Sequence, residues 1–108
     1  MKKTNILKQI PKNLQEEIFE KIISTKNIKI ERIISYGHTS PKSGWYEQEE
    51  NEWVIVLEGE AVLSFDDEKD IHLKEGDYIN IPAFKKHKVK WTKPKHKTVW
   101  LAVFYFKS

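Results

Sequence analysis

Two acidic residues, Glu47 and Glu52, are separated by four residues and have the side chains and spacing best suited to chemistry. If residues 48–51 form a hairpin loop, the two carboxylates become cross-strand neighbours on one face, roughly 5 Å apart between their Cβ atoms. Like charges directly opposite one another are destabilising, so the pair requires a cation between the carboxylates, a shared proton, or exposure of both to water. The first two alternatives predict an enclosed polar site that holds a positive group.

The elements that must position these carboxylates are short and apolar. Residues 52–58 and 61–65 are runs rich in valine, isoleucine and aromatic residues, interrupted at Gly59. Runs of this length favour strands over helices. Further strands are predicted at residues 28–36, 70–74, 78–81, 89–92 and 99–106. About eight short strands joined by turns predict an all-β sandwich or barrel.

Near the N-terminus the spacing of the apolar residues changes. Leu14, Ile18 and Ile22 fall at helical spacing, and Asn13 followed by Glu16 is typical of a capping box. The sequence therefore predicts one short helix over residues 14–23. The chain is then a single domain, with an N-terminal arm and helix in residues 1–27 and a β-barrel in residues 28–108.

Composition excludes several classes of protein. The 108 residues carry a net charge of +3 and no cysteine, so neither a disulfide framework nor a thiolate metal site is available. The basic start of the chain is not followed by an apolar core long enough for a signal peptide. The longest apolar run, residues 99–106, is too short to cross a bilayer. A cytoplasmic protein with no membrane partner is expected.

Two spacings resemble the signatures of the cupin superfamily. The first is Glu52, six residues and Gly59, and the second is Gly76, five residues and Pro82, followed by His87. The likeness is densest over residues 45–87, and the chain resembles a group of small single-domain bacterial cupins. It implies a double-stranded β-helix, or jelly-roll barrel, which agrees with the number of strands.

The resemblance also implies a metal site, from which this sequence departs. The usual set is three histidines and one glutamate, and only Glu52 and His87 remain. The other histidine positions hold Trp45 and Glu47 in one alignment, or Tyr46 and Gln48 in the other. A set made of Glu47 or Gln48 with Glu52 and His87 would suit a mononuclear divalent metal such as iron, manganese or zinc. If the protein is an enzyme, Glu47 or Glu52 would move protons.

The alternative is a metal-free module that binds or senses a small molecule without turnover. Neither the sequence nor the resemblance chooses between catalysis and binding. In either case a small-molecule ligand is expected inside the barrel, with its mouth lined by His38, Trp45, Tyr46, Tyr78 and Phe84.

Two expectations concern macromolecular partners. The lysines of residues 85–97 alternate with residues of buried type, which is typical of a solvated strand face, so no nucleic-acid partner is expected. The resemblance and the number of aromatic residues in a small barrel predict a homodimer.

Overall fold

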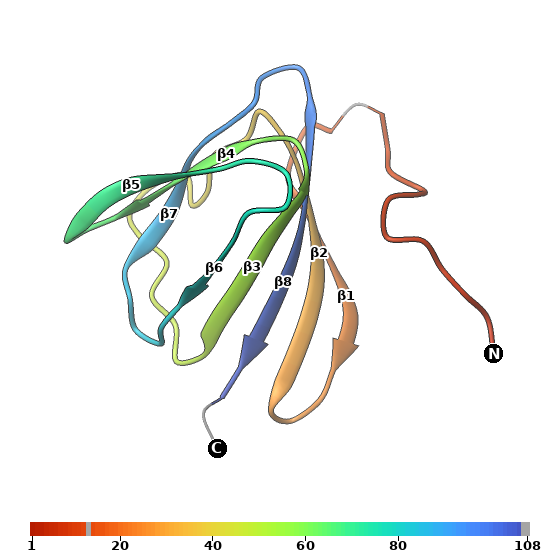
Figure 1. Ribbon diagram of the computed structural model, residues 1–108, viewed down its shortest axis with the longest axis horizontal. Coiled ribbons are helices and arrows are strands. Elements are labelled where there is room, and N and C mark those ends of the chain that lie inside the picture. Colours follow the sequence, from red (N-terminus) through yellow and green to blue (C-terminus); the bar gives the residue numbers. More distant parts are fainter. Residues whose placement is uncertain (13, 107–108) are drawn as a thin grey trace.

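The computed structural model describes residues 1–12 and 14–106 as eight strands in two antiparallel sheets (Figure 1). The strands are β1 (Ile18–Ser24), β2 (Ile28–Tyr36), β3 (Asn51–Glu58), β4 (Ala61–Phe65), β5 (Glu68–Leu73), β6 (Tyr78–Ile81), β7 (His87–Thr92) and β8 (Lys97–Tyr105). Five of them form one sheet in the order β1-β2-β8-β3-β6, and three form the other in the order β5-β4-β7. The predicted all-β class is confirmed.

The predicted N-terminal helix is wrong, because residues 18–23 of it belong to β1 and residues 14–17 form no helix. This strand pairs antiparallel with β2, in a register that places Ile18 opposite Ile34 and Phe19 opposite Ile33. The isoleucines and Phe19 favour a strand, and pairing with β2 covers one edge of the sheet, which outweighs the helical spacing. The five-stranded sheet therefore begins at Ile18 rather than Ile28. Asn13, the expected helix cap, lies outside the described residues.

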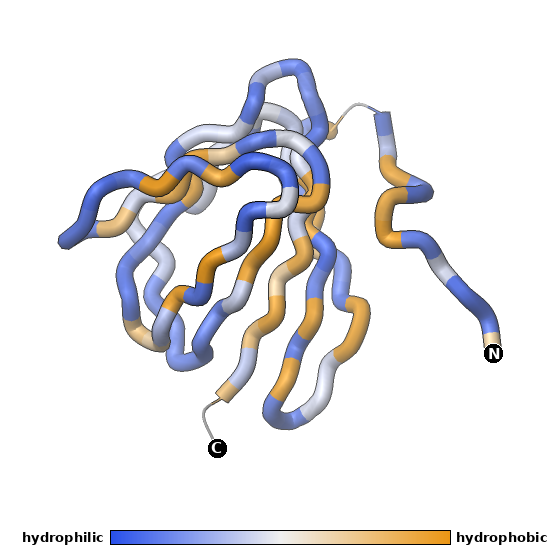
Figure 2. The backbone as a smooth tube through the Cα atoms, in the orientation of Figure 1, coloured by the Kyte–Doolittle hydropathy of each residue, from blue (hydrophilic) through white to orange (hydrophobic). Residues whose placement is uncertain are grey.

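The core lies between the two sheets. Alternate residues of β3, Glu52, Val54 and Val56, are buried, and they face buried residues of β4 such as Leu63 and Phe65. Figure 2 shows hydrophobic residues along the strands of the large sheet and hydrophilic residues in most of the connecting loops. Period-2 burial of this kind follows from the alternation of side chains along a strand.

Gly59 makes the tight turn that carries the chain from one sheet to the other. Its φ is +94°, and a Cβ atom there would lie 2.7 Å from the Thr98 Cα atom and from the Lys97 carbonyl oxygen. Only glycine combines this backbone conformation with so close an approach to β8. The turn thereby sets the position of β4 relative to β3.

The predicted hairpin between Glu47 and Glu52 is also wrong. The Tyr46 backbone exchanges hydrogen bonds with His87, of 2.8 and 3.1 Å, and the Phe84 amide donates to the Gln48 carbonyl at 2.7 Å. Residues 46–48 therefore run beside the start of β7 rather than back along β3. The two carboxylates are consequently not cross-strand neighbours.

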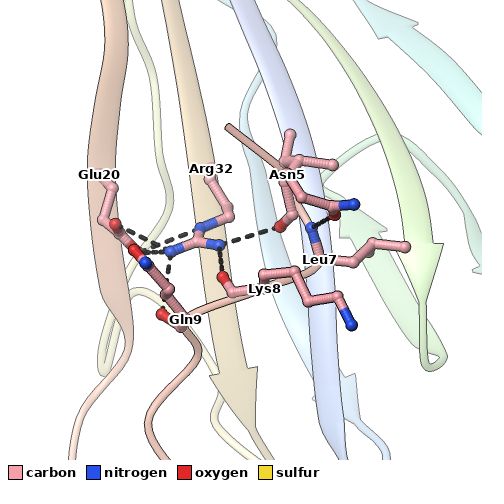
Figure 3. A network of polar contacts seen from close by, with 7 residues as sticks. Asn5, Leu7, Lys8, Gln9, Glu20 and Arg32 are labelled. Carbon is pink, nitrogen blue, oxygen red and sulfur yellow. Dashed lines mark hydrogen bonds and ion pairs between the residues drawn. The ribbon is translucent and has the colours of Figure 1, made fainter. Parts of the chain in front are cut away.

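The N-terminal segment is fastened to the sheet by Arg32 of β2 (Figure 3). Its guanidinium donates to the Ile6 and Lys8 carbonyl oxygens at 2.9 and 2.7 Å and to both oxygens of Glu20 on β1. These bonds use the fork geometry of arginine fully. Over residues 1–12 and 14–106 there is no helix of the length and apolar character needed to cross a membrane.

Candidate functional site

A cavity of about 120 Å³ lies between the two sheets. The large sheet supplies most of its wall, and β4, β7 and the segment before β3 supply the rest. The lining residues are Glu17, Phe19, Glu31, Ile33, Ser40, Tyr46, Gln48, Glu52, Val54, Leu63, Ile81, His87, Val89, Trp100 and Phe104. This space admits several water molecules or a small organic molecule.

Glu52 and His87 meet at this cavity. The His87 Nε2 atom lies 3.3 Å from Glu52 Oε1, and both side chains are almost fully buried, 5% and 12% exposed respectively. The Gln48 side-chain amide donates to the same Glu52 oxygen at 3.1 Å. The sequence predicted that these three residues would share one site, and the fold brings them together there.

The orientation of His87 follows from its other nitrogen. Nδ1 lies 2.8 Å from the Lys85 carbonyl oxygen, which can only accept, so Nδ1 carries a proton and Nε2 faces Glu52. Burial disfavours the imidazolium form, but the Glu52 carboxylate and the Lys85 carbonyl outweigh it and raise the pKa of His87 above its ordinary value. His87 therefore remains an imidazolium to a higher pH than an ordinary histidine.

Local structure explains why this histidine points inward from a run of lysines. His87 begins β7, and alternation along the strand places Lys88 toward solvent and His87, which is 4% exposed, toward the core. Its ring packs beside those of Phe65 and Tyr46, with centroids 6.4 and 5.8 Å away. His87 therefore faces the interior between the two sheets.

Tyr46 lines the cavity next to this pair. Burial raises the pKa of its phenol, a hydrogen bond with Ser40 opposes the shift, and the charges of Glu17 and Glu52 add to it. The hydroxyl therefore stays protonated at neutral pH and remains a hydrogen-bond donor. Two separate carboxylates thus act on one phenol in the cavity.

Sequence reasoning missed three polar groups of the cavity. Glu17 accepts a 2.8 Å hydrogen bond from the Ser35 hydroxyl, and Glu31 lies 3.9 Å from the Lys29 ammonium. Trp100 is 3% exposed, and its indole Nε1 is the one buried side-chain polar atom without a partner among the described residues. The predicted helix over residues 14–23 hid the position of Glu17 beside the sheet. For Glu31, the alternation of Glu31, Ile33 and Ser35 in β2 could have indicated that its side chain faces inward.

Several predicted site residues lie away from the cavity lining. Glu47 is exposed. Both His38 nitrogens are used locally, since Nδ1 accepts from the Tyr36 amide at 2.8 Å and Nε2 lies 3.1 Å from the Gln15 carbonyl oxygen. Trp45 lies under the Lys88 ammonium at 4.4 Å. Tyr78 packs against Trp53 on the outer face of the large sheet, and Phe84 is exposed.

The donor set does not fit a resident metal well. Among the residues that the structure describes, no group of three or more histidine, aspartate and glutamate side chains is placed to hold a metal ion. Glu52 and His87 supply two donors, and Gln48 directs its amide N–H group to Glu52. Metal sites in proteins ordinarily draw at least three ligands from the chain.

Two antiparallel sheets that enclose a mostly apolar cavity with a few polar groups define a small β-barrel protein. The family model described as "Cupin domain" matches residues 33–104. The chain belongs to the cupin family. A comparison with curated proteins finds no match.

Solved structures agree with this assignment. A "putative mannose-6-phosphate isomerase" from Ralstonia eutropha JMP134 is 36% identical, with a TM-score of 0.93 over 99% of this chain and 100% of that chain. A cupin superfamily protein from Desulfitobacterium hafniense DCB-2 is 21% identical, with a TM-score of 0.75 over 91% and 84% of the two chains. An RmlC-like cupin family protein with a double-stranded β-helix fold, from Methanocaldococcus jannaschii, is 18% identical, with a TM-score of 0.72 over 90% and 86%. The last two are evidence of the fold alone.

Proposed function

We propose that this cupin binds a small polar organic molecule in the cavity between its sheets, without a resident metal. The observation that carries the proposal is the buried pair of Glu52 and His87 beside open volume. Burying two charges costs several kcal/mol per ion, which their mutual attraction must offset. A buried pair is therefore an inefficient way to stabilise the fold alone. Facing a cavity, it can orient a polar ligand.

The chemistry around the pair supports binding of a ligand with both donors and acceptors. Glu52 accepts hydrogen bonds, while the Tyr46 hydroxyl and the His87 imidazolium donate them. Apolar side chains such as Val54 and Leu63 complete the wall. A mostly apolar pocket with a few convergent polar groups is typical of small-molecule sites.

A pair of valine substitutions tests this proposal. Val89 lines the cavity, and Val103 is also half-buried but lies on the outer face of β8. In a screen of small polar metabolites by ligand-observed NMR, V89F should abolish the binding that wild type and V103F both show. Ligands that bind V89F as well as they bind wild type, in a folded protein, would place the binding site elsewhere and contradict the proposal.

A metal-dependent enzyme is the second candidate. It is favoured by the His87 hydrogen bond to the Lys85 carbonyl, because metal-bound histidines usually donate their other N–H group in this way. The name of the Ralstonia eutropha protein is that of an enzyme, an isomerase. Glu52 and His87 would hold the ion, with Gln48 as a third donor if its side-chain amide rotated to present its oxygen. The ion would supply Lewis-acid chemistry. Glu52 would be the candidate proton carrier.

Elemental analysis of protein purified without an affinity tag separates the two candidates. The first predicts less than about a tenth of an equivalent of any transition metal, unchanged by reloading. Stoichiometric iron, manganese or zinc that is reduced in E52Q would favour the second.

A further inference from the structure

The carboxylates of the cavity are only partly compensated by cations of the protein. Glu52 faces the His87 imidazole, and Glu31 lies 3.9 Å from the Lys29 ammonium. Glu17 accepts from the neutral Ser35 hydroxyl and, in the described part of the chain, has no cationic partner. Its charge therefore gives the cavity a negative field, which its effect on the pKa of Tyr46 also reports.

A second observation points to a missing partner. Trp100 lines the same cavity, and its Nε1–H group is buried without an acceptor. A buried donor left unpaired costs its full desolvation penalty, so native proteins rarely leave one. A ligand that supplies an acceptor atom would satisfy this group.

The rim of the cavity already holds one ammonium group. The Lys29 Nζ atom lies 4.7 Å from the centroid of the Phe104 ring and 3.9 Å from Glu31, and both of those residues line the cavity. Aromatic faces beside carboxylates are favourable surroundings for organic cations. Phe19 of β1, opposite Ile33 of β2, adds another aromatic ring to the lining, two residues after Glu17.

We propose that the ligand is a small organic ammonium ion bearing a hydrogen-bond acceptor, with its ammonium at Glu17 and its acceptor at Trp100 Nε1. This inference rests on the proposed function and names the class of molecule bound. It also separates this cavity from a site for a sugar phosphate, because an uncompensated carboxylate in the wall repels a phosphate group.

Three matched probes test the class: 3-amino-1-propanol, 1,3-propanediol and 3-hydroxypropionate. Each keeps one hydroxyl as an acceptor, and the other end is a cation, a neutral group or an anion. Calorimetric titration of the wild-type protein should show the amine binding at least about tenfold more tightly than the diol, and the anion not at all. Equal or tighter binding of the diol or the anion would overturn the proposed class while leaving a ligand-binding cavity in place.

Two substitutions test the location. E17Q keeps an acceptor for Ser35 and should reduce the affinity for the amine about tenfold, with the diol unchanged, because only the charge is lost. W100F should weaken the amine and the diol alike, by about fivefold, since both lose the same acceptor contact. E16Q, an exposed neighbour, is the matched control and should change neither.

Thermal melts establish that each variant is folded before titration. Amine binding that is indifferent to E17Q in a folded protein would overturn the assignment of the ammonium site. If none of the three probes binds at 20 mM while other metabolites still bind wild type but not V89F, the ammonium class is wrong and the proposed function stands. If none of the three probes binds and no other metabolite distinguishes wild type from V89F, the proposed function itself is contradicted.

Discussion

Among the described residues, two almost fully buried cations each pair with a glutamate, one on each face of the large sheet. On the outer face, Arg32 of β2 pairs with Glu20 of β1 at 2.7 Å (Figure 3). On the inner face, His87 pairs with Glu52 at 3.3 Å. Both cations are almost fully buried, yet their surroundings differ.

The two pairs differ in the number of polar groups beside them that are left available to bind a ligand. Arg32 gives its remaining N–H groups to carbonyl oxygens of Ile6, Lys8 and Gln9, so nothing is left for a ligand. The His87 pair borders open volume and the unpaired Trp100 Nε1 atom. A fully satisfied pair fastens one segment to another, whereas a pair beside unsatisfied groups and space is a candidate binding site.

The largest effect is expected from R32M, which breaks the outer pair. Methionine keeps an apolar stem but leaves Glu20 and the carbonyl oxygens of the N-terminal segment without a donor. Breaking a buried pair costs about 3–5 kcal/mol, and Glu20, whose side chain is 43% exposed, can regain water. We therefore expect a loss of about 2–3 kcal/mol in the free energy of unfolding, measured by urea denaturation.

The same variant sharpens the comparison when its binding is measured. R32M should retain the wild-type affinity for the amine probe at a temperature where it is folded, and R32K should recover part of the stability, because lysine lacks the fork. Loss of binding without loss of stability would show that the outer pair contributes to the site, contrary to the distinction drawn between the two.

A smaller effect on stability is expected from E52Q in the inner pair. Glutamine keeps the shape and can still accept from Gln48, but His87 loses its anionic partner. Hydrogen bonds to charged groups are worth about 1.5–3 kcal/mol, and the imidazole can become neutral, so we expect a loss of about 1–2 kcal/mol at pH 6. The affinity for the amine probe should fall as well, in contrast to R32M. A raised melting temperature in E52Q would mean that Glu52 is destabilised by neighbouring carboxylates rather than stabilised by His87.

Much of the fold was predictable from the sequence. The strand over residues 52–58 and the interruption at Gly59 follow from local side-chain and backbone chemistry, and both are found. The helix over residues 14–23 was wrong because its spacing satisfied two periods at once. The decisive factor was the edge of β2, which the order of strands in the whole sheet leaves open for β1. Local spacing carries no information on such pairing.

The candidate site was predictable only in part, for the same reason. Glu52 and His87 were identified because the spacing of the residues around them resembles the cupin signatures. Their pairing with Gln48, rather than with Glu47, depends on residues 46–48 lying beside β7. Glu17 lies just before β1 and Trp100 lies in β8, and only the order of strands in the sheet brings them to the same cavity.

The smallest expected effect is a dependence of stability on pH that belongs to the inner pair. The pKa of His87 is raised in the folded protein above its ordinary value of 6.5, mainly by the Glu52 carboxylate acting against burial. A raised folded-state pKa contributes stability that is fully present below about pH 6.5 and is lost as the pH rises through the folded-state value. The free energy of unfolding should therefore decline from pH 6 toward alkaline pH.

The difference between wild type and H87Q isolates this contribution, because every other side chain is the same in both proteins. Urea denaturation at half-unit steps from pH 5.5 to 8.5 should show that the gap in the free energy of unfolding between wild type and H87Q narrows as the pH rises. R32M should show the wild-type slope, since arginine remains charged throughout this range. A gap that widened with pH would require His87 to be neutral at pH 6 in the folded protein, and the inner pair would then be a neutral hydrogen bond rather than an ion pair.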